Sequence, residues 1–264
     1  MASPQTSAGP KGLTVITGGS SGVGKATVEA FAEAGTDVVF TYNRNESAAH
    51  ELANRITGVG GSCTPMHLDA GGEASVMSFV DALRALDRPI ATLVNCAGQV
   101  FRGAVPDTPT ETFRAQLEVN VVAPFVLTRE LAPLLRGGSI VNVASISSVT
   151  GMVDRSAYCT SKAAIAGLTS ATATELAPHT RVNAVLAGIL ATPMNQGLLE
   201  NKELLSTVAV RVPLGRLGEG AEIADVIVFL ASEGARYVTG AMWEVDGGVL
   251  ARTSLPAGDP RLDG

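Results

Sequence analysis

The sequence has only three cysteines, no long apolar run, and fewer basic than acidic residues. Cys63, Cys96 and Cys159 are odd in number and lack metal-ligand spacing, so we expect neither a disulfide framework nor a zinc or other metal site. No apolar segment approaches the ~20 residues that cross a bilayer, and the amino-terminal residues lack the apolar region of a secretory signal. We therefore expect a soluble protein of the reducing cytoplasm.

Positive charge is also scarce. The 19 lysines and arginines are outnumbered by 25 aspartates and glutamates, which gives a net charge of −6. Nucleic-acid binders need a basic face to release counterions, so we exclude a nucleic-acid partner. Only 17% of the residues are charged, whereas 46% are hydrophobic and 29 residues are glycines. Such a chain can bury a sizeable core and pack helices closely on a sheet.

Short apolar runs alternate with longer alanine-rich stretches along the chain. The runs predict seven strands, at LTVIT, DVVFT, SCTPMHL, ATLVN, SIVNVAS, RVNAVLA and AMWEV. The stretches between them have helical spacing and predict helices at roughly 23–34, 46–58, 73–86, 110–135, 157–177 and 220–233. This alternation predicts an α/β fold: a single doubly wound Rossmann domain with a mostly parallel seven-stranded sheet and helices on both faces.

No internal repeat, charge block or linker divides the chain, so we place one domain at 11–250. Residues 1–10 and 251–264 are predicted terminal extensions. The second of these is rich in turn residues, so we expect it to be loosely ordered or to contact a neighbouring subunit. The segment 190–218 is predicted to be an irregular insertion that covers a site.

A glycine-rich turn joins the first strand to a helix that begins near Lys25. A helix N-terminus presents unpaired N–H groups and a positive dipole, so the turn is expected to bind an anion. Gly18 would make the tight turn, Gly22 would let the backbone approach a pyrophosphate, and Gly24 would let the helix pack close to the strand. The predicted cofactor contacts of this turn are Gly18, Ser20, Ser21, Gly22, Val23 and Gly24.

The same turn admits two other interpretations. Gly19, Gly24 and Lys25 satisfy G-x-x-x-x-G-K, the opening of a P-loop. That motif needs a Ser or Thr hydroxyl after the lysine to hold magnesium, and Ala26 stands there. The remaining interpretation is a glycine-rich connection without a ligand, which loses weight as further motifs are added.

The end of the second strand bears on the choice of nicotinamide cofactor. NAD sites usually place an acidic side chain there, about 20 residues past the turn, for the ribose hydroxyls. The strand instead ends in Tyr42, Asn43 and Arg44, which we predict to be cofactor contacts, and Asp37 lies at its other end. Arg44 could hold a 2′-phosphate through fork-like charged hydrogen bonds, or it could be an ordinary solvated arginine. We therefore favour NADP(H), with NAD(H) possible.

Three polar residues are spaced so that they meet at one edge of the sheet. Ser145 ends the fifth strand, and thirteen residues later Tyr158 begins Y-x-x-x-K with Lys162. This spacing puts Tyr158 and Lys162 on adjacent turns of one helix. The strand end brings Ser145 to the carboxyl edge, where open α/β sheets bind ligands. A lone Tyr-x-x-x-Lys is more often a surface pair, and here its placement after the glycine turn favours a catalytic role.

These residue types suit hydride transfer to a carbonyl carbon. Negative charge develops on the carbonyl oxygen, so the site needs a proton donor and a hydrogen bond aimed at that atom. Tyr158 can give the proton and Ser145 can hold the oxygen. The ammonium of Lys162 and the oxidised nicotinamide are the positive charges that would stabilise the tyrosinate.

Together the motifs resemble those of the short-chain dehydrogenase/reductase family. The turn T-G-x-x-x-G-x-G, the strand end NCAG, the pair Y-x-x-x-K and the segment RVNAVLAGILATP follow in the family's order. The resemblance implies an NAD(P)-dependent oxidoreductase that interconverts a ketone and a secondary alcohol. It also implies a homotetramer that pairs the long helices, and the last helix and strand, across subunits.

Further site residues are implied by this resemblance alone. Asp69, with Ala70 beside it, would bond the adenine ring. Lys162 and Tyr158 would also contact the cofactor, the lysine through the nicotinamide ribose. Asn120 would hold a water that connects the lysine to solvent.

Two family motifs are present with one replacement each. Cys96 takes the place of the second asparagine in N-N-A-G, while the other predicted contacts of that motif are kept, at Asn95, Ala97 and Gly98. The next predicted contacts, with the nicotinamide carboxamide, are Gly188, Ile189 and Thr192. Ala187 replaces the rigid proline that usually precedes them, so that loop is expected to be looser.

The substrate and the subtype stay open. Within the family, the overall pattern resembles the β-ketoacyl (3-oxoacyl) carrier-protein reductases. These usually present basic residues on the two long helices, whereas the matching positions here are Val126 and Thr174, with Arg129 nearby. A non-catalytic dinucleotide-binding protein would typically lack the tyrosine or the lysine, and both are present.

Selectivity for the small-molecule substrate should come from the segments 99–105, 147–156 and 190–218. Three apolar residues of these segments would either form a wall of the substrate site or belong to the core. They are Met152, Met194 and Leu198.

Overall fold

A computed structural model describes residues 12–251. The predictions for the amino-terminal extension, and for all of the carboxyl-terminal tail but its first residue, lie outside the described residues. Within them the predicted sheet is present, with strands β1 (Leu13–Ile16), β2 (Asp37–Tyr42), β3 (Cys63–His67), β4 (Ile90–Asn95), β5 (Ser139–Ser145), β6 (Arg181–Ala187) and β7 (Met242–Val245).

The seven strands form one parallel sheet. Their order is β3-β2-β1-β4-β5-β6-β7, and every neighbouring pair is parallel. The chain builds the sheet outward from β1 in one direction and then from β4 in the other. Between these two strands lies the switch point at which open α/β sheets bind ligands, outside the carboxyl ends of the strands.

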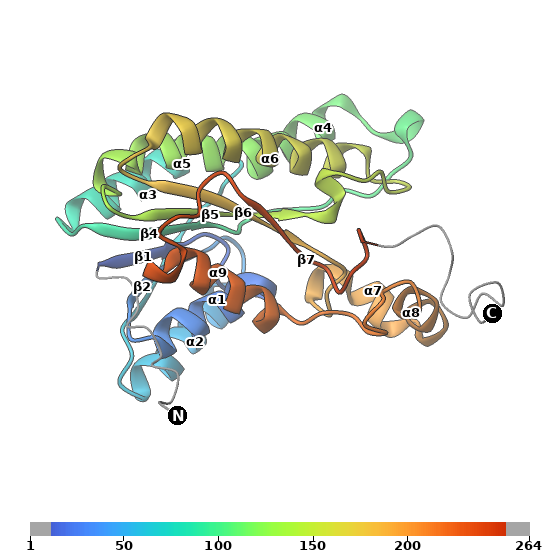
Figure 1. The fold of residues 1–264 in the computed structure, drawn as a ribbon, viewed down its shortest axis with the longest axis horizontal. Coiled ribbons are helices and arrows are strands. Elements are labelled where there is room, and N and C mark those ends of the chain that lie inside the picture. Colours follow the sequence, from blue (N-terminus) through green and yellow to red (C-terminus); the bar gives the residue numbers. More distant parts are fainter. Residues whose placement is uncertain (1–11, 252–264) are drawn as a thin grey trace.

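Helices cover both faces of the sheet. They are α1 (Gly22–Glu33), α2 (Glu46–Gly58), α3 (Glu73–Ala85), α4 (Thr110–Leu117), α5 (Ala123–Leu131), α6 (Ser156–Leu176), α7 (Gln196–Glu200), α8 (Lys202–Ala209) and α9 (Gly220–Ala231). Figure 1 shows α3, α4, α5 and α6 on one side of the sheet and α1, α2 and α9 on the other. The predicted doubly wound α/β architecture is confirmed. No helix among the described residues combines the length and apolarity needed to cross a membrane.

The core consists of two main apolar clusters, one on each side of the sheet. On one side, Phe31 of α1 and Ile227 of α9 are buried with Phe40 of β2. On the other side, Phe79 of α3 is buried with Val15 of β1. Because both faces of the strands are buried, the strand sequences are continuous apolar runs rather than alternating ones.

The predicted single helix at 110–135 is wrong in one respect. A π-helical turn at Glu118–Val122 separates α4 from α5. Pro124 has no N–H to donate to the carbonyl of Asn120, and the N–H of Ala123 reaches back five residues to the carbonyl of Glu118. The wider turn accommodates one additional residue, and it leaves Asn120 buried on the inner side of the helix.

The prediction that 190–218 is irregular is also wrong. The segment contains α7 and α8, and Asn201 caps α8 by accepting a hydrogen bond from the N–H of Leu204 at 3.0 Å. Figure 1 shows both short helices projecting at one end of the layered domain. Each is shorter than the ~10–12 residues from which apolar periodicity can identify a helix.

The glycine turn between β1 and α1 is compact. Gly18 has φ +70°, and a Cβ atom on Gly24 would lie 2.1 Å from the carbonyl oxygen of Gly18. We expected Gly24 to let the helix approach the strand, and the closest contact is with the turn itself. The two glycines therefore let the chain fold back on its own backbone before α1 continues.

We predict that Gly24→Ala lowers the free energy of unfolding by about 1–3 kcal/mol, because the new methyl group overlaps backbone that cannot move without opening the turn. Gly58→Ala is the matched control, since a Cβ at that helical glycine meets nothing within 4 Å. Urea denaturation followed by circular dichroism measures both. Equal midpoints for the two variants would contradict the close contact.

Candidate active site

A large cavity opens at the carboxyl ends of the strands. Its volume is about 1420 Å³, and it is lined by the turn after β1 and by the chain just after β2, β3, β4, β5 and β6. Pockets for drug-sized ligands measure about 300–1,000 Å³, so this one has room for a larger ligand or for two ligands side by side.

The turns after β1 and β4 are bonded to each other beneath this cavity. The buried hydroxyl of Thr17 accepts hydrogen bonds from the N–H groups of Cys96 and Ala97, each at 3.0 Å. The N–H of Gly18 donates to the hydroxyl of Thr41 at 3.0 Å, which joins the turn to β2 as well. These bonds fix the floor of the cavity at the switch point of the sheet.

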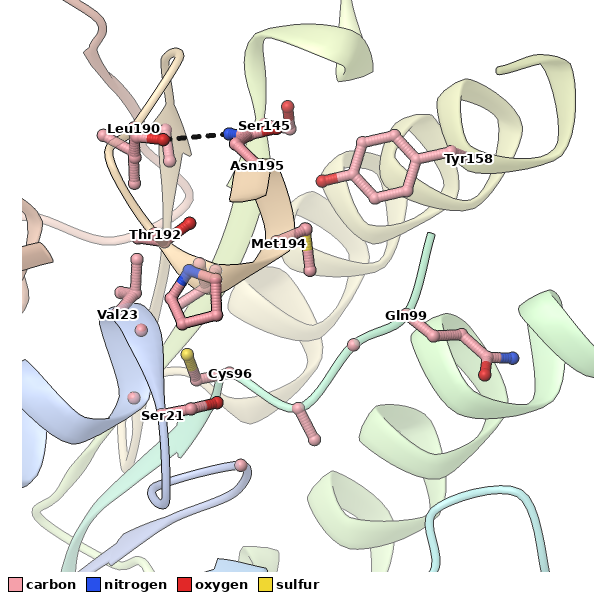
Figure 2. Close-up of a pocket in the computed structure, with 18 of the residues that line it drawn as sticks. Ser21, Val23, Cys96, Gln99, Ser145, Tyr158, Leu190, Thr192, Met194 and Asn195 are labelled. Carbon is pink, nitrogen blue, oxygen red and sulfur yellow. Dashed lines mark hydrogen bonds between the residues drawn. The ribbon is translucent and has the colours of Figure 1, made fainter. Parts of the chain in front are cut away.

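The N-terminus of α1 faces the cavity and has no acidic residue to satisfy it. Ser21 occupies the capping position without a side-chain cap, and the first turn contains no carboxylate. All six predicted contacts of this turn line the cavity (Gly18, Ser20, Ser21, Gly22, Val23 and Gly24). Figure 2 shows Ser21 and Val23 at its lower edge. The unpaired amides form an anion site of the kind that binds dinucleotide phosphates.

The P-loop interpretation of this turn finds no support. Lys25 is exposed and does not line the cavity, and Ala26 supplies no hydroxyl. Among residues 12–251 no group of three or more His, Cys, Asp or Glu side chains is placed to hold a metal ion.

One end of the cavity is formed by the residues after β2 and β3. The predicted contacts Tyr42, Asn43, Arg44, Asp69 and Ala70 all line it. The amide of Asn43 donates to the carboxylate of Asp69 at 3.3 Å, and that carboxylate also accepts from the N–H of Gly71 at 3.0 Å. Arg44 is exposed at this end of the cavity.

Asp37 lies at the opposite end of β2, as the sequence predicted. It pairs with Arg88, and a hydrogen bond from that guanidinium lowers the pKa of the aspartate. The described residues at the carboxyl end of β2, Tyr42, Asn43 and Arg44, include no carboxylate of the kind that an NAD site usually has there.

The three predicted catalytic side chains are buried and line the same cavity. Ser145 ends β5, whereas Tyr158 and Lys162 lie on adjacent turns of α6. The Lys162 ammonium donates to the carbonyl of Val143 at 2.7 Å and lies 5.8 Å from the centroid of the Tyr158 ring. Figure 2 shows the Tyr158 hydroxyl pointing into the cavity. The chain thus brings a hydroxyl donor, a phenol and an ammonium to one place.

The Ser145 hydroxyl is oriented by its own chain. Its oxygen accepts a hydrogen bond from the N–H of Ser147 at 3.1 Å, which caps the short turn that follows β5. A hydroxyl has one hydrogen to donate, and this contact leaves it available. The residue can therefore donate to an oxygen atom placed in the cavity.

Asn120 is buried and its side chain makes three hydrogen bonds to protein groups. Its amide nitrogen donates to the carbonyl of Gln99 at 3.0 Å and to the hydroxyl of Ser161 at 2.9 Å. Its amide oxygen accepts from the N–H of Gln99 at 2.9 Å. The side chain ties the loop after β4 to α6, and the predicted water bridge to Lys162 stays a prediction.

Asn95 does not line the cavity, unlike its neighbours Ala97 and Gly98. Its amide nitrogen donates to the amide oxygen of Asn142 at 2.8 Å, so the side chain is engaged inside the sheet. Cys96 lines the cavity in place of an asparagine, and burial raises the pKa of its thiol to about 11. The thiol is therefore protonated near neutral pH.

The segment after β6 is held in place despite the absence of a proline. Gly188, Ile189 and Thr192 all line the cavity. The N–H of Gly218 donates to the carbonyl of Ile189 at 3.0 Å, and the N–H of Gly188 donates to Val245 at 3.0 Å. These backbone bonds restrain the loop that we expected Ala187 to loosen.

The predicted selectivity segments surround the remaining part of the cavity. Met152, Met194 and Leu198 line it and are not buried, so they form part of its wall rather than the core. In Figure 2 Met194 lies between Tyr158 and Thr192, and Asn195 is bonded to the carbonyl of Leu190 at 2.9 Å. Two arginines of the predicted segments, Arg102 and Arg155, also line the cavity, and no sequence motif points to either of them.

Comparison with known proteins decides the family. A family model described as enoyl-(acyl carrier protein) reductase matches residues 18–250. The chain belongs to the short-chain dehydrogenase/reductase family. The resemblance inferred from the motifs is thereby confirmed, and with it the assignment to an oxidoreductase family.

Relatives within the short-chain dehydrogenase/reductase family differ in their substrates. The 3-oxoacyl-[acyl-carrier-protein] reductase of Thermotoga maritima is 35% identical over 242 residues, which cover 90% of this chain and 97% of that protein. The L-rhamnose 1-dehydrogenase (NAD(P)(+)) of Azotobacter vinelandii is 36% identical over 248 residues, which cover 89% and 95%.

Solved structures of the family have the same fold. A gluconate 5-dehydrogenase from Burkholderia cenocepacia, in complex with NADP and tartrate, superposes with a TM-score of 0.86 at 27% identity. The match covers 92% of this chain and 97% of that one. The named substrates of these relatives are a carrier-bound acyl group and two different sugars or sugar acids, so membership in the family leaves the substrate of this chain open.

Proposed function

We propose that this protein is an NADP(H)-dependent oxidoreductase that interconverts a ketone and a secondary alcohol on a small molecule. The observation that carries the proposal is the convergence of Ser145, Tyr158 and Lys162 in the cavity that also contains the uncapped N-terminus of α1. The cavity's size and its unpaired backbone amides fit a dinucleotide with its phosphates on the glycine turn.

The proposed chemistry uses three groups of the chain. A bound nicotinamide supplies or accepts the hydride. In the direction of reduction, Ser145 donates a hydrogen bond to the carbonyl oxygen and Tyr158 gives its hydroxyl proton to that oxygen. Lys162 is held by the Val143 carbonyl beside the phenol, where its positive charge stabilises the tyrosinate that remains. In the direction of oxidation, the same tyrosinate takes the proton back.

We predict that Tyr158→Phe lowers kcat for ketone reduction by at least about 10³-fold, because the proton donor is lost while the ring is kept. The dissociation constant for NADPH should change less than about threefold, a difference below one kcal/mol. The matched control is Tyr237→Phe, since that tyrosine is fully exposed and does not line the cavity. Substantial turnover by the Tyr158 variant would remove the tyrosine from the mechanism.

The preference for NADP(H) is proposed from the end of β2. Arg44 lines the cavity there, whereas Asp37 forms an ion pair with Arg88 at the other end of the strand. The solved gluconate 5-dehydrogenase relative contains NADP, which agrees with this proposal. A guanidinium can grip the 2′-phosphate with two parallel charged hydrogen bonds.

We predict that NADPH binds at least ~10-fold more tightly than NADH, and that Arg44→Ala removes most of this preference. Fluorescence titration with both cofactors measures the two dissociation constants. Arg114→Ala is the control, because Arg114 is exposed on α4 and lies outside the cavity lining. If NADH binds as well as NADPH to the unaltered protein, Arg44 has no role in selection.

The carrier-protein subtype is less well supported than reduction of a free small molecule. Val126, one of the two positions where such reductases present a basic residue, is a buried apolar side chain of α5. Thr174 is exposed on α6 but carries no charge. A non-catalytic dinucleotide-binding role is disfavoured by the shared placement of Tyr158 and Lys162 in the cavity.

We also propose the domain limits, location and assembly. The catalytic domain is 11–250, with extensions at 1–10 and 251–264, and the segment 190–218 covers the substrate. Location in the cytoplasm is consistent with three unpaired cysteines.

The homotetramer is supported by exposed aromatic residues on α5, α9 and β7, namely Phe125, Phe229 and Trp243. Light scattering should give about four times the 26.9 kDa of one chain, and the mass of one chain would reject it.

A further inference from the structure

The cavity is positively charged, although the protein as a whole is acidic. The net charge of the chain is −6, yet Asp69 is the one carboxylate among the described residues that line the cavity. The cationic side chains of the lining are Arg44, Arg102, Arg155, Lys162 and Arg211. The proposed function uses Arg44 for the cofactor and Lys162 for the tyrosine. Neither role explains the positive charge of the remaining arginines, which line the part of the cavity formed by the predicted selectivity segments.

Two of these arginines are brought together by a backbone contact between the loop after β4 and the loop before α6. The N–H of Gly103 donates to the carbonyl of Asp154 at 2.9 Å, and Gly103 pairs with Arg155 in an isolated parallel bridge. Arg102 precedes Gly103 in the chain and therefore lies beside the segment that contains Arg155. Arg155 in turn lies one helical turn before Tyr158.

Neither arginine is paired with a carboxylate among residues 12–251. Arg102 donates weakly to the carbonyl of Met194 at 3.3 Å and to the side chain of Asn195 at 3.4 Å. Arg155 is half-buried, and its contact is with the sulfur of Met152 at 3.9 Å. Burial, and then the charge of Arg102, lower the pKa of the Arg155 guanidinium. Two like charges held together without a counter-charge are stabilised when an anion binds between them.

The start of α6 adds to the same positive field. Arg155 occupies its capping position without a side-chain hydrogen bond, and the first turn contains no acidic residue. The helix has 21 residues, so its N-terminus carries the full partial charge of the macrodipole. The arginine pair and this helix end act together on whatever lies beside Tyr158.

We propose that the substrate carries an anionic oxygen group, a carboxylate or a phosphate monoester, in addition to its reacting carbonyl or alcohol, and that Arg102 and Arg155 bind this group. The inference rests on the proposed function, since it concerns the substrate of the same site. Guanidinium groups suit both anions because their paired N–H donors match two oxygen atoms. The anion would anchor the substrate with its carbonyl toward Ser145 and Tyr158.

The test compares matched charged and neutral substrates with NADPH. One arm uses oxo acids of increasing chain length, each paired with its own amide, and the other uses dihydroxyacetone phosphate paired with dihydroxyacetone. For the best pair, kcat/KM of the unaltered protein should favour the anion by at least about tenfold, as expected for charged hydrogen bonds. The arm that shows the preference identifies carboxylate or phosphate. Equal kcat/KM within every pair overturns the proposal.

Variants separate anion binding from a merely structural role. Arg102→Gln and Arg155→Gln should each lower kcat/KM for the anionic substrate by about tenfold or more and leave the neutral partner nearly unchanged. Arg155→Lys keeps the charge without the fork and should retain part of the preference. Arg114→Gln, an exposed arginine outside the cavity lining, should change neither value. Equal losses on both substrates would show that the arginines only hold the loops.

A binding measurement keeps this proposal distinct from the proposed function. Calorimetric titration of the NADPH-loaded protein with hexanoate, and separately with inorganic phosphate, should show binding of one anion that the double variant Arg102→Gln/Arg155→Gln loses. If an anion binds in this way but no carbonyl compound is reduced, the anion site is supported and the proposed reaction is contradicted. If neutral ketones are reduced and neither anion binds, the proposed reaction is supported and the anion site is contradicted.

Discussion

The two hydrogen bonds that the buried Thr17 hydroxyl accepts hold the candidate active site together. They join the turn after β1 to the turn after β4. Between these two adjacent strands the order in which the chain adds strands to the sheet reverses. The glycine turn is thereby fixed relative to the chain that leads into Gln99, and Asn120 fixes that chain to α6 in turn. The glycine turn and the proposed catalytic side chains belong to different elements, and these linked hydrogen bonds set their relative positions.

Most of the fold was predictable because it depends on local periodicity. Strand sequences that are apolar on both faces, and helices of twelve or more residues, give clear patterns, and the observed elements follow them closely. The π-helical turn was missed although Pro124 lies inside the predicted helix at 110–135, where a proline disturbs the regular hydrogen bonds. Such a proline can produce a kink or a wider turn, and only the five-residue bond to Glu118 identifies the wider turn. The helices α7 and α8 were missed because they are short.

The candidate site could likewise be predicted only in part from the sequence. Ser145, Tyr158 and Lys162 could be placed from sequence because a strand end and a helical repeat fix them locally. The amide of Asn95 turned inward to Asn142, which no spacing along one strand reveals. The neighbouring positions of Arg102 and Arg155 depend on a bridge between segments some fifty residues apart, so only the folded chain brings them together.

The π-helical turn also bears on how this part of the chain can change in evolution. A turn closed by a five-residue hydrogen bond contains about one residue more than an α-helical turn, so it absorbs the extra residue within nearly the same rotation. Deleting one residue from Glu118–Val122 would convert the turn to regular α-helix and leave the faces that α4 and α5 present to the sheet nearly unchanged. The packing of α4 and α5 is therefore expected to tolerate such a deletion. Its cost would fall on the inward placement of Asn120, which the wider turn provides.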